Sequence, residues 1–151
     1  KKTEQWFCGE RKGDILLFHL GYMNRVLFKR ANQYLANSGY AVRAEQIPLL
    51  MALYMGGGQS QQELAEETGR DKASVLRTIR LLAEYGYVHI GDDPDDGRKH
   101  IIMLTKDGVK LMEQMLNIVV RVDRILFSAI GESDKNKLIR IMTKISSRLR
   151  D

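Results

Sequence analysis

Hydrophobic residues recur with helical spacing over both ends of the chain. Residues 14–37 and 106–149 carry apolar side chains on more than one helical face, whereas a surface helix of a globular protein needs a single apolar stripe. A helix that is apolar on two faces packs on its own core and on a second surface. We therefore expect the helices in these two segments to form a homodimer interface.

The middle of the chain predicts shorter helices separated by glycines. The first covers about residues 43–54, and Pro48 is its weak point because a proline beyond the first turn removes a backbone hydrogen bond. A glycine triplet at 56–58 then ends the helix. Ser60 and Glu63 have the spacing of a capping box, in which the two side chains satisfy free amides at a helix start.

This second short helix ends at the turn Thr68-Gly69-Arg70, and a third short helix follows. Asp71 has the side chain to cap the third helix, which runs to about residue 85. Three apolar residues share one of its faces at the spacing of helical neighbours, so that face is expected to be buried. They are Val75, Ile79 and Leu82.

A β-hairpin is predicted next. Residues 87–90 and 100–104 are rich in β-branched and other apolar side chains, and the polar segment between them contains Asp96-Gly97, a typical hairpin turn. Thr105 is placed to cap a long helix over residues 106–130, and Ser133 is placed to cap the last helix.

Two short helices joined by a tight turn, followed by a hairpin, are typical of a winged helix-turn-helix that binds double-stranded DNA. The second helix enters the major groove, and its N-terminal residues reach the base edges first. Arg77 is the best candidate to bind guanine through two parallel hydrogen bonds. Leu76 either contacts a thymine methyl group or packs inside. The candidate DNA-binding residues are Lys72, Ala73, Ser74, Leu76 and Arg77 on the helix, and Arg98 and Lys99 on the hairpin.

Net charge alone would not have indicated DNA. The formal charge is +5, but most of the basic excess follows residue 105 and so lies outside the predicted reading elements. The chain is 44% hydrophobic and 28% charged, a balance typical of a folded globular protein. Without a long apolar run or the apolar core of a secretory signal at the start, we expect a cytoplasmic protein. A single cysteine, Cys8, fits a reducing compartment.

The chain resembles the MarR family of bacterial transcription regulators. The resemblance rests on Glu63-Leu64-Ala65, on Asp71-Lys72-Ala73-Ser74-Val75, and above all on Asp96-x-Arg98 followed by Leu104-Thr105-x-x-Gly108. It implies a mainly α fold with a small hairpin wing (α+β), and it adds Asp96 to the candidate DNA-binding residues. It also implies a repressor that acts as a homodimer on an inverted-repeat operator and is released by a small aromatic or lipophilic ligand.

The resemblance also suggests how the chain is divided. An extension over residues 1–13 precedes a dimerisation helix over 14–40, the winged lobe covers 41–104, and C-terminal dimerisation helices cover 105–151. Four positions depart from the family pattern, and Arg80 and Leu81 are two of them. Arg43 stands where a threonine often caps the second helix, and Leu76 stands where the family often has a small hydroxyl residue.

Other chemistry is less well supported by the residues. Four residues could line a ligand cavity beside the lobe, although aromatic and methionine side chains on helices are more often core. They are Phe18, Tyr22, Met51 and Tyr54. The three histidines and Cys8 lack the spacing of a metal site, and nothing indicates a cofactor. Without a nucleophile, base and orienting group the chain is not expected to be an enzyme. The alternative function is a protein–protein interaction module built on the same fold.

Overall fold

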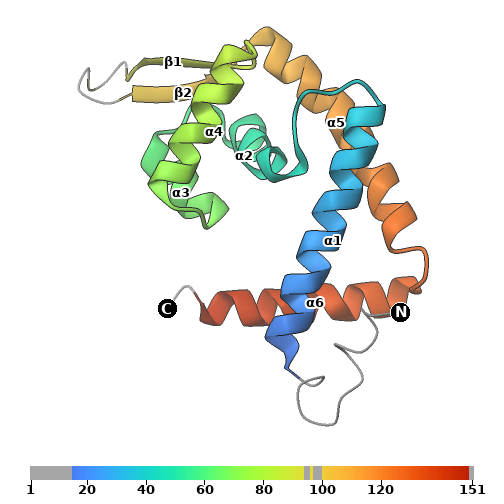
Figure 1. Ribbon diagram of the computed structural model, residues 1–151. Helices are drawn as coiled ribbons and strands as arrows, with labels where there is room; N and C mark the ends of the chain where they lie inside the picture. Colours follow the sequence, from blue (N-terminus) through green and yellow to red (C-terminus); the bar gives the residue numbers. More distant parts are fainter. Residues whose placement is uncertain (1–14, 94–95, 97–99, 150–151) are drawn as a thin grey trace.

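A computed structural model describes residues 15–93, 96 and 100–149 (Figure 1). The fold is mainly α-helical with one antiparallel hairpin, as predicted from the sequence. The elements in chain order are α1 (Leu16–Asn37), the 3₁₀ turn η2 (Ala44–Gln46), α2 (Ile47–Gly56), α3 (Gln61–Thr68), α4 (Lys72–Glu84), β1 (Val88–Asp92), β2 (His100–Leu104), α5 (Lys106–Leu126) and α6 (Glu132–Arg148).

The helices α2, α3 and α4 and the hairpin surround one apolar core. Val75, Ile79 and Leu82 of α4 are buried in it, as their helical spacing predicted. The first half of α5 closes the core from the side with Met112 and Met115, which are both fully buried. This lobe therefore holds α4 rigidly, while the opposite face of α4 remains open to solvent.

The hairpin is longer at its outer end than the sequence indicated. β1 runs to Asp92 and pairs with β2 from Val88↔Leu104 to Asp92↔His100. On its other side β2 forms a bridge with Gln59, whose backbone exchanges two hydrogen bonds with Ile102 at 3.0 and 2.8 Å. The hairpin is therefore tied to the loop that precedes α3.

Two helix starts differ from the sequence-based expectation. The segment after Arg43 begins as a 3₁₀ turn, so Pro48 falls at the start of α2, where a missing amide hydrogen costs little. It is therefore not a weak point. The last helix is capped by Gly131 rather than by Ser133, which lies in its first turn. The prediction of a Ser133 cap was wrong.

Outside the lobe, α1, α5 and α6 form a frame. α1 runs beside α5, and α6 lies at the end of this pair that is away from the lobe (Figure 1). Lys135 of α6 forms an ion pair with Asp123 of α5. No residue of α6 is buried. Among the described helices none is both long and apolar enough to cross a membrane.

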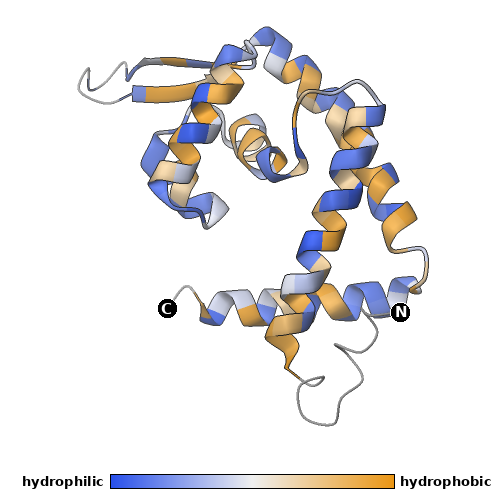
Figure 2. Ribbon diagram, in the orientation of Figure 1, coloured by the Kyte–Doolittle hydropathy of each residue, from blue (hydrophilic) through white to orange (hydrophobic). Residues whose placement is uncertain are grey.

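Hydrophobic side chains remain exposed on this frame, as Figure 2 shows for the lower end of α1. Leu17 and Phe18 of α1 are 74% and 61% exposed. One row of exposed hydrophobic residues on α6 comprises Leu138, Ile141, Met142 and Ile145, and Leu149 follows directly after the helix; Ile139 is exposed outside this row. An apolar surface of this extent usually indicates a protein–protein contact.

Candidate nucleic-acid interface

Local hydrogen bonds fix where α3 and α4, the two helices of the predicted helix-turn-helix, begin and end. The Ser60 hydroxyl accepts a hydrogen bond from the Glu63 amide at 3.3 Å, and the Glu63 carboxylate accepts one from the Ser60 amide at 2.7 Å. This is the predicted capping box of α3. Gly69 ends α3 with φ of 64°, a left-handed conformation that suits glycine. The Asp71 carboxylate then accepts from the Ser74 amide at 2.8 Å and caps α4.

The predicted DNA-reading residues at the start of α4 do not all have the same environment. Lys72, Ala73 and Arg77 are exposed on the side away from the core. Leu76 is half-buried and does not belong to the core cluster, so its role in reading thymine remains a prediction. The Ser74 hydroxyl is already engaged, because it accepts a hydrogen bond from Arg70 at 2.7 Å.

The tip of the hairpin is described only in part. Asp96 is half-buried, whereas Arg98 and Lys99 lie outside the described residues, as Cys8 does. Their assignment to a wing therefore remains a prediction from the sequence. Below the tip, Nδ1 of His100 and a carboxylate oxygen of Asp92 lie 3.2 Å apart across the two strands.

The structure explains the Leu-Thr-x-x-Gly pattern that follows the hairpin. Thr105 caps α5, since its hydroxyl accepts from the Gly108 amide at 3.0 Å, and the same hydroxyl donates to the Gly86 carbonyl at 2.6 Å. A Cβ atom at Gly108 would lie 2.0 Å from the carbonyl oxygen of Tyr87. Only glycine lets α5 approach the start of the hairpin this closely. Thr105 and Gly108 together therefore hold the hairpin against the lobe.

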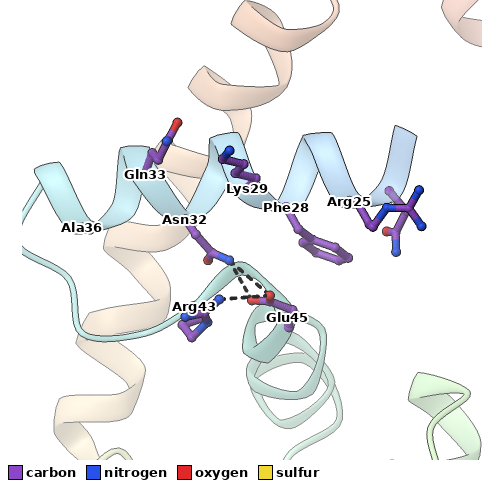
Figure 3. Close-up of a pocket in the computed structure, with 9 residues that line it drawn as sticks. Arg25, Phe28, Lys29, Asn32, Gln33, Ala36, Arg43 and Glu45 are labelled. Carbon is purple, nitrogen blue, oxygen red and sulfur yellow. Dashed lines mark hydrogen bonds and ion pairs between the residues drawn. The ribbon is translucent and has the colours of Figure 1, made fainter. Parts of the chain in front are cut away.

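An open groove of about 550 Å³ lies between α1 and η2 (Figure 3). Arg25, Lys29 and Arg43 line it, and Phe28 contributes an aromatic ring. Glu45 is the one acidic residue among the lining side chains. The groove therefore carries a net positive charge beside an aromatic surface, a combination that suits an aromatic carboxylate.

Asn32 and Glu45 form a tight polar contact at this groove. The Asn32 amide donates to both carboxylate oxygens of Glu45, at 3.2 and 3.0 Å, and its carbonyl accepts from the Ala44 amide at 2.7 Å. Asn32 thus caps η2 from α1. Arg43, the residue at the N-cap position, cannot accept this hydrogen bond because its side chain has no acceptor. Partial burial acts to raise the pKa of Glu45, but hydrogen bonds from Asn32, from its own backbone and from Arg43 outweigh it and hold the pKa below its ordinary value.

The four predicted ligand residues do not line this groove, nor a smaller apolar cavity of about 250 Å³ between α1, α2 and α5. Met51 and Tyr54 pack against the core. Phe18 is exposed and Tyr22 is half-buried. Sequence reasoning missed the residues of the groove because charged side chains on a helix are usually only solvated.

The architecture is that of a winged-helix protein. A family model described as "MarR family" matches residues 38–99, which cover most of the lobe. Over the residues of this match, the chain is similar to the MarR family.

Curated relatives show a similarity of the same kind. Among curated relatives, the chain is 26% identical over 100 residues to the HTH-type transcriptional repressor NicR of Pseudomonas putida. The matched part covers 66% of this chain and 63% of NicR. The chain thus spans less than two thirds of that relative's length.

Solved structures agree in fold. A MarR variant from E. coli in complex with operator DNA superposes with a TM-score of 0.78 at 22% identity, covering 87% of this chain and 94% of that one. BpsR of Bordetella bronchiseptica, studied for its regulation by 6-hydroxynicotinic acid, superposes with a TM-score of 0.72 at 24% identity and covers 83% and 91%. Identities this low establish the fold alone.

Proposed function

We propose that the protein is a transcription regulator, a repressor, that binds an inverted-repeat operator as a homodimer. The observation that carries the proposal is the exposed N-terminal face of α4, where Lys72 and Arg77 project from a helix that the core holds in place. Cationic side chains at this position serve phosphates and base edges in the major groove. The repressor name of NicR and the operator complex of the MarR variant support the proposal.

The exposed apolar residues of α1 and α6 support the homodimer. Two lobes related by a two-fold axis would present two α4 helices to two half-sites about one helical turn apart. The test is selection of bound duplexes from a random DNA pool. Recovery of an inverted repeat supports the proposal, whereas no enrichment favours the alternative of a protein–protein interaction module, whose binding need not weaken steeply with salt.

Replacement of Arg77 by alanine is expected to weaken binding to the selected operator by about 1–3 kcal/mol and to relax the preference at a single base pair. The reason is that one guanidinium can make two parallel hydrogen bonds to a guanine. Titration of duplexes with each base pair in turn measures the change. Arg98→Ala is the comparison, since a wing contact to phosphate should weaken all sequences alike. Unchanged preference at every base pair in Arg77→Ala would contradict the assignment.

We further propose that an aromatic acid releases the protein from DNA by binding between the lobe and the frame. The sequence-based candidates Phe18, Tyr22, Met51 and Tyr54 line neither described opening. The groove with Arg25, Lys29 and Arg43 has the suitable chemistry. The regulation of BpsR by 6-hydroxynicotinic acid supports an effector of this class. The ligand would act by favouring a distance between the two lobes of the dimer that does not match the distance between the two half-sites of the operator.

Such an effector must obey reciprocity. If salicylate lowers the affinity for operator DNA by a factor of about 5–150, operator DNA must lower the affinity for salicylate by the same factor. Calorimetric titration of salicylate into free and operator-bound protein measures both factors. Lys29→Gln tests the groove, because it removes one charge while preserving most of the side-chain volume. Equal affinity in the two titrations, or no binding at millimolar concentration, would contradict the effector proposal and leave DNA binding intact.

A further inference from the structure

Arg70 lies two residues before the start of α4, where a basic residue would be expected to contact a DNA phosphate. The structure directs its guanidinium to the protein instead. Nη1 donates to the backbone carbonyl of Glu45 at 3.2 Å, and Nη2 donates to the Ser74 hydroxyl at 2.7 Å. Arg70 is half-buried, so its side chain bridges η2 and the N-terminal turn of α4.

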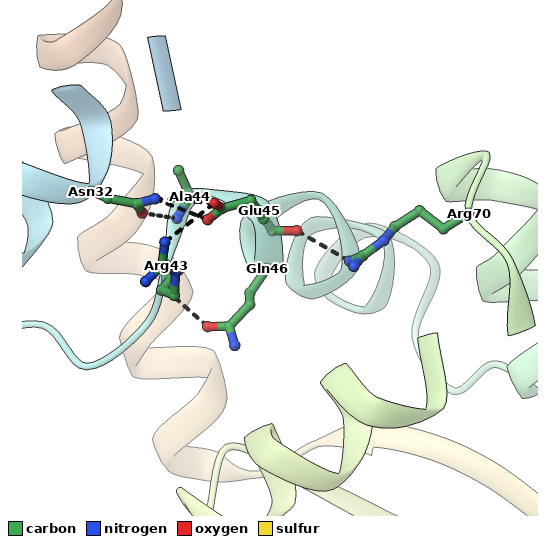
Figure 4. Close-up of polar contacts among 6 residues, drawn as sticks. All are labelled: Asn32, Arg43, Ala44, Glu45, Gln46 and Arg70. Atoms are coloured by element: carbon green, nitrogen blue, oxygen red, sulfur yellow. Dashed lines mark hydrogen bonds and ion pairs between the residues drawn. The ribbon is translucent and has the colours of Figure 1, made fainter. Parts of the chain in front are cut away.

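The bridge continues beyond η2 (Figure 4). The Glu45 side chain accepts two hydrogen bonds from Asn32 of α1, and the Ala44 amide donates to the Asn32 carbonyl. A continuous series of contacts therefore runs from α1 through η2 to Arg70 and Ser74. It joins the frame to the end of α4 that faces DNA in the proposed function.

We propose that Arg70 is a positioning residue: with Asn32 and Glu45 it ties the N-terminus of α4 to α1 and thereby sets the orientation of the reading helix. The proposal rests on the proposed function for its effect on DNA. It distinguishes Arg70 from Lys72, two residues further along, which is exposed and free to contact phosphate.

The physical argument is one of geometry. α1 and α4 are separated in the chain by η2, α2 and α3, so the lobe that holds α4 can rotate as a unit relative to α1 unless contacts between the two fix it. A planar guanidinium can hold two acceptors at fixed angles, whereas an ammonium group acts as a single point charge. Only arginine can therefore keep the Glu45 carbonyl and the Ser74 hydroxyl at fixed relative positions.

The test compares Arg70→Lys, Arg70→Ala and Asn32→Ala with Lys72→Ala, by titration of the selected operator over a range of salt concentrations. We expect the two Arg70 variants and Asn32→Ala each to bind about tenfold more weakly with an unchanged salt slope. Lys72→Ala should instead reduce the slope by about one unit, as loss of a phosphate contact does. Circular dichroism at the same concentrations confirms that each variant is folded.

The outcomes separate the two proposals. Wild-type affinity in Arg70→Lys together with a shallower slope in Arg70→Ala would show a phosphate contact and overturn the positioning role. If the wild-type protein enriches no duplex from the random DNA pool, the proposed function is overturned, and so is the claim that Arg70 affects DNA binding.

A second measurement needs no DNA. Amide hydrogen exchange at residues 72–76 should be faster in Asn32→Ala than in wild type, although Asn32 lies on α1. Unchanged exchange there would show that α1 and α4 are not linked through these contacts, and it would overturn the inference even if DNA binding is established.

Discussion

Ile141→Glu is expected to convert the protein to a monomer and to weaken operator binding by more than about 100-fold, because two linked half-site contacts would become one. Ile141 is 46% exposed on the apolar row of α6 that includes Leu138, Ile145 and Leu149. A carboxylate in the middle of an apolar interface would lose its hydration without gaining a partner. Light scattering measures the mass, and operator titration measures the affinity.

Ile139→Glu is the matched control. It introduces the same substitution on the same helix, at a residue that is 52% exposed, but about 160° away around the helix axis. It should leave both the mass and the affinity near those of the wild type. If wild type itself has the mass of a monomer, or if both variants dissociate equally, the apolar row is not the dimer interface.

Gly108→Ala is expected to destabilise the protein by about 2–3 kcal/mol, the cost of overfilling a packed site, although alanine normally favours a helix. The added Cβ would lie 2.0 Å from the Tyr87 carbonyl oxygen, which belongs to the backbone and cannot rotate away. α5 must then move from the start of the hairpin and strain the Thr105 contacts. Thermal unfolding should show a midpoint lower by roughly 5–10 °C.

Gly21→Ala makes the same change inside α1, where the added Cβ would have no atom within 4 Å apart from its own chain neighbours and the adjacent helix backbone. It should be neutral or slightly stabilising, since alanine has the higher helix propensity. A midpoint that rises equally in both variants would show that α5 does not approach Tyr87 as closely as the structure has it.

Features of the fold that depend on neighbours in the sequence could be predicted from the sequence. Ser60, Asp71 and Thr105 cap the helices that follow them within three residues. The buried face of α4 follows from helical periodicity alone. Each of these interactions is closed within one or two turns, so the local order of polar and apolar residues is sufficient to specify it.

Contacts between distant segments could not be predicted in this way. Asn32 meets Glu45 from 13 residues away, and Arg70 reaches the Glu45 carbonyl from 25. From the sequence Arg70 belongs only to the turn before the reading helix, and the packing of α1 against the lobe made it a bridge. Gly108 likewise belonged to the Leu-Thr-x-x-Gly pattern, but only the close approach of α5 to Tyr87 explains why glycine is needed at that position. Local pattern determines which elements form, whereas the partners of a long polar side chain depend on how those elements pack.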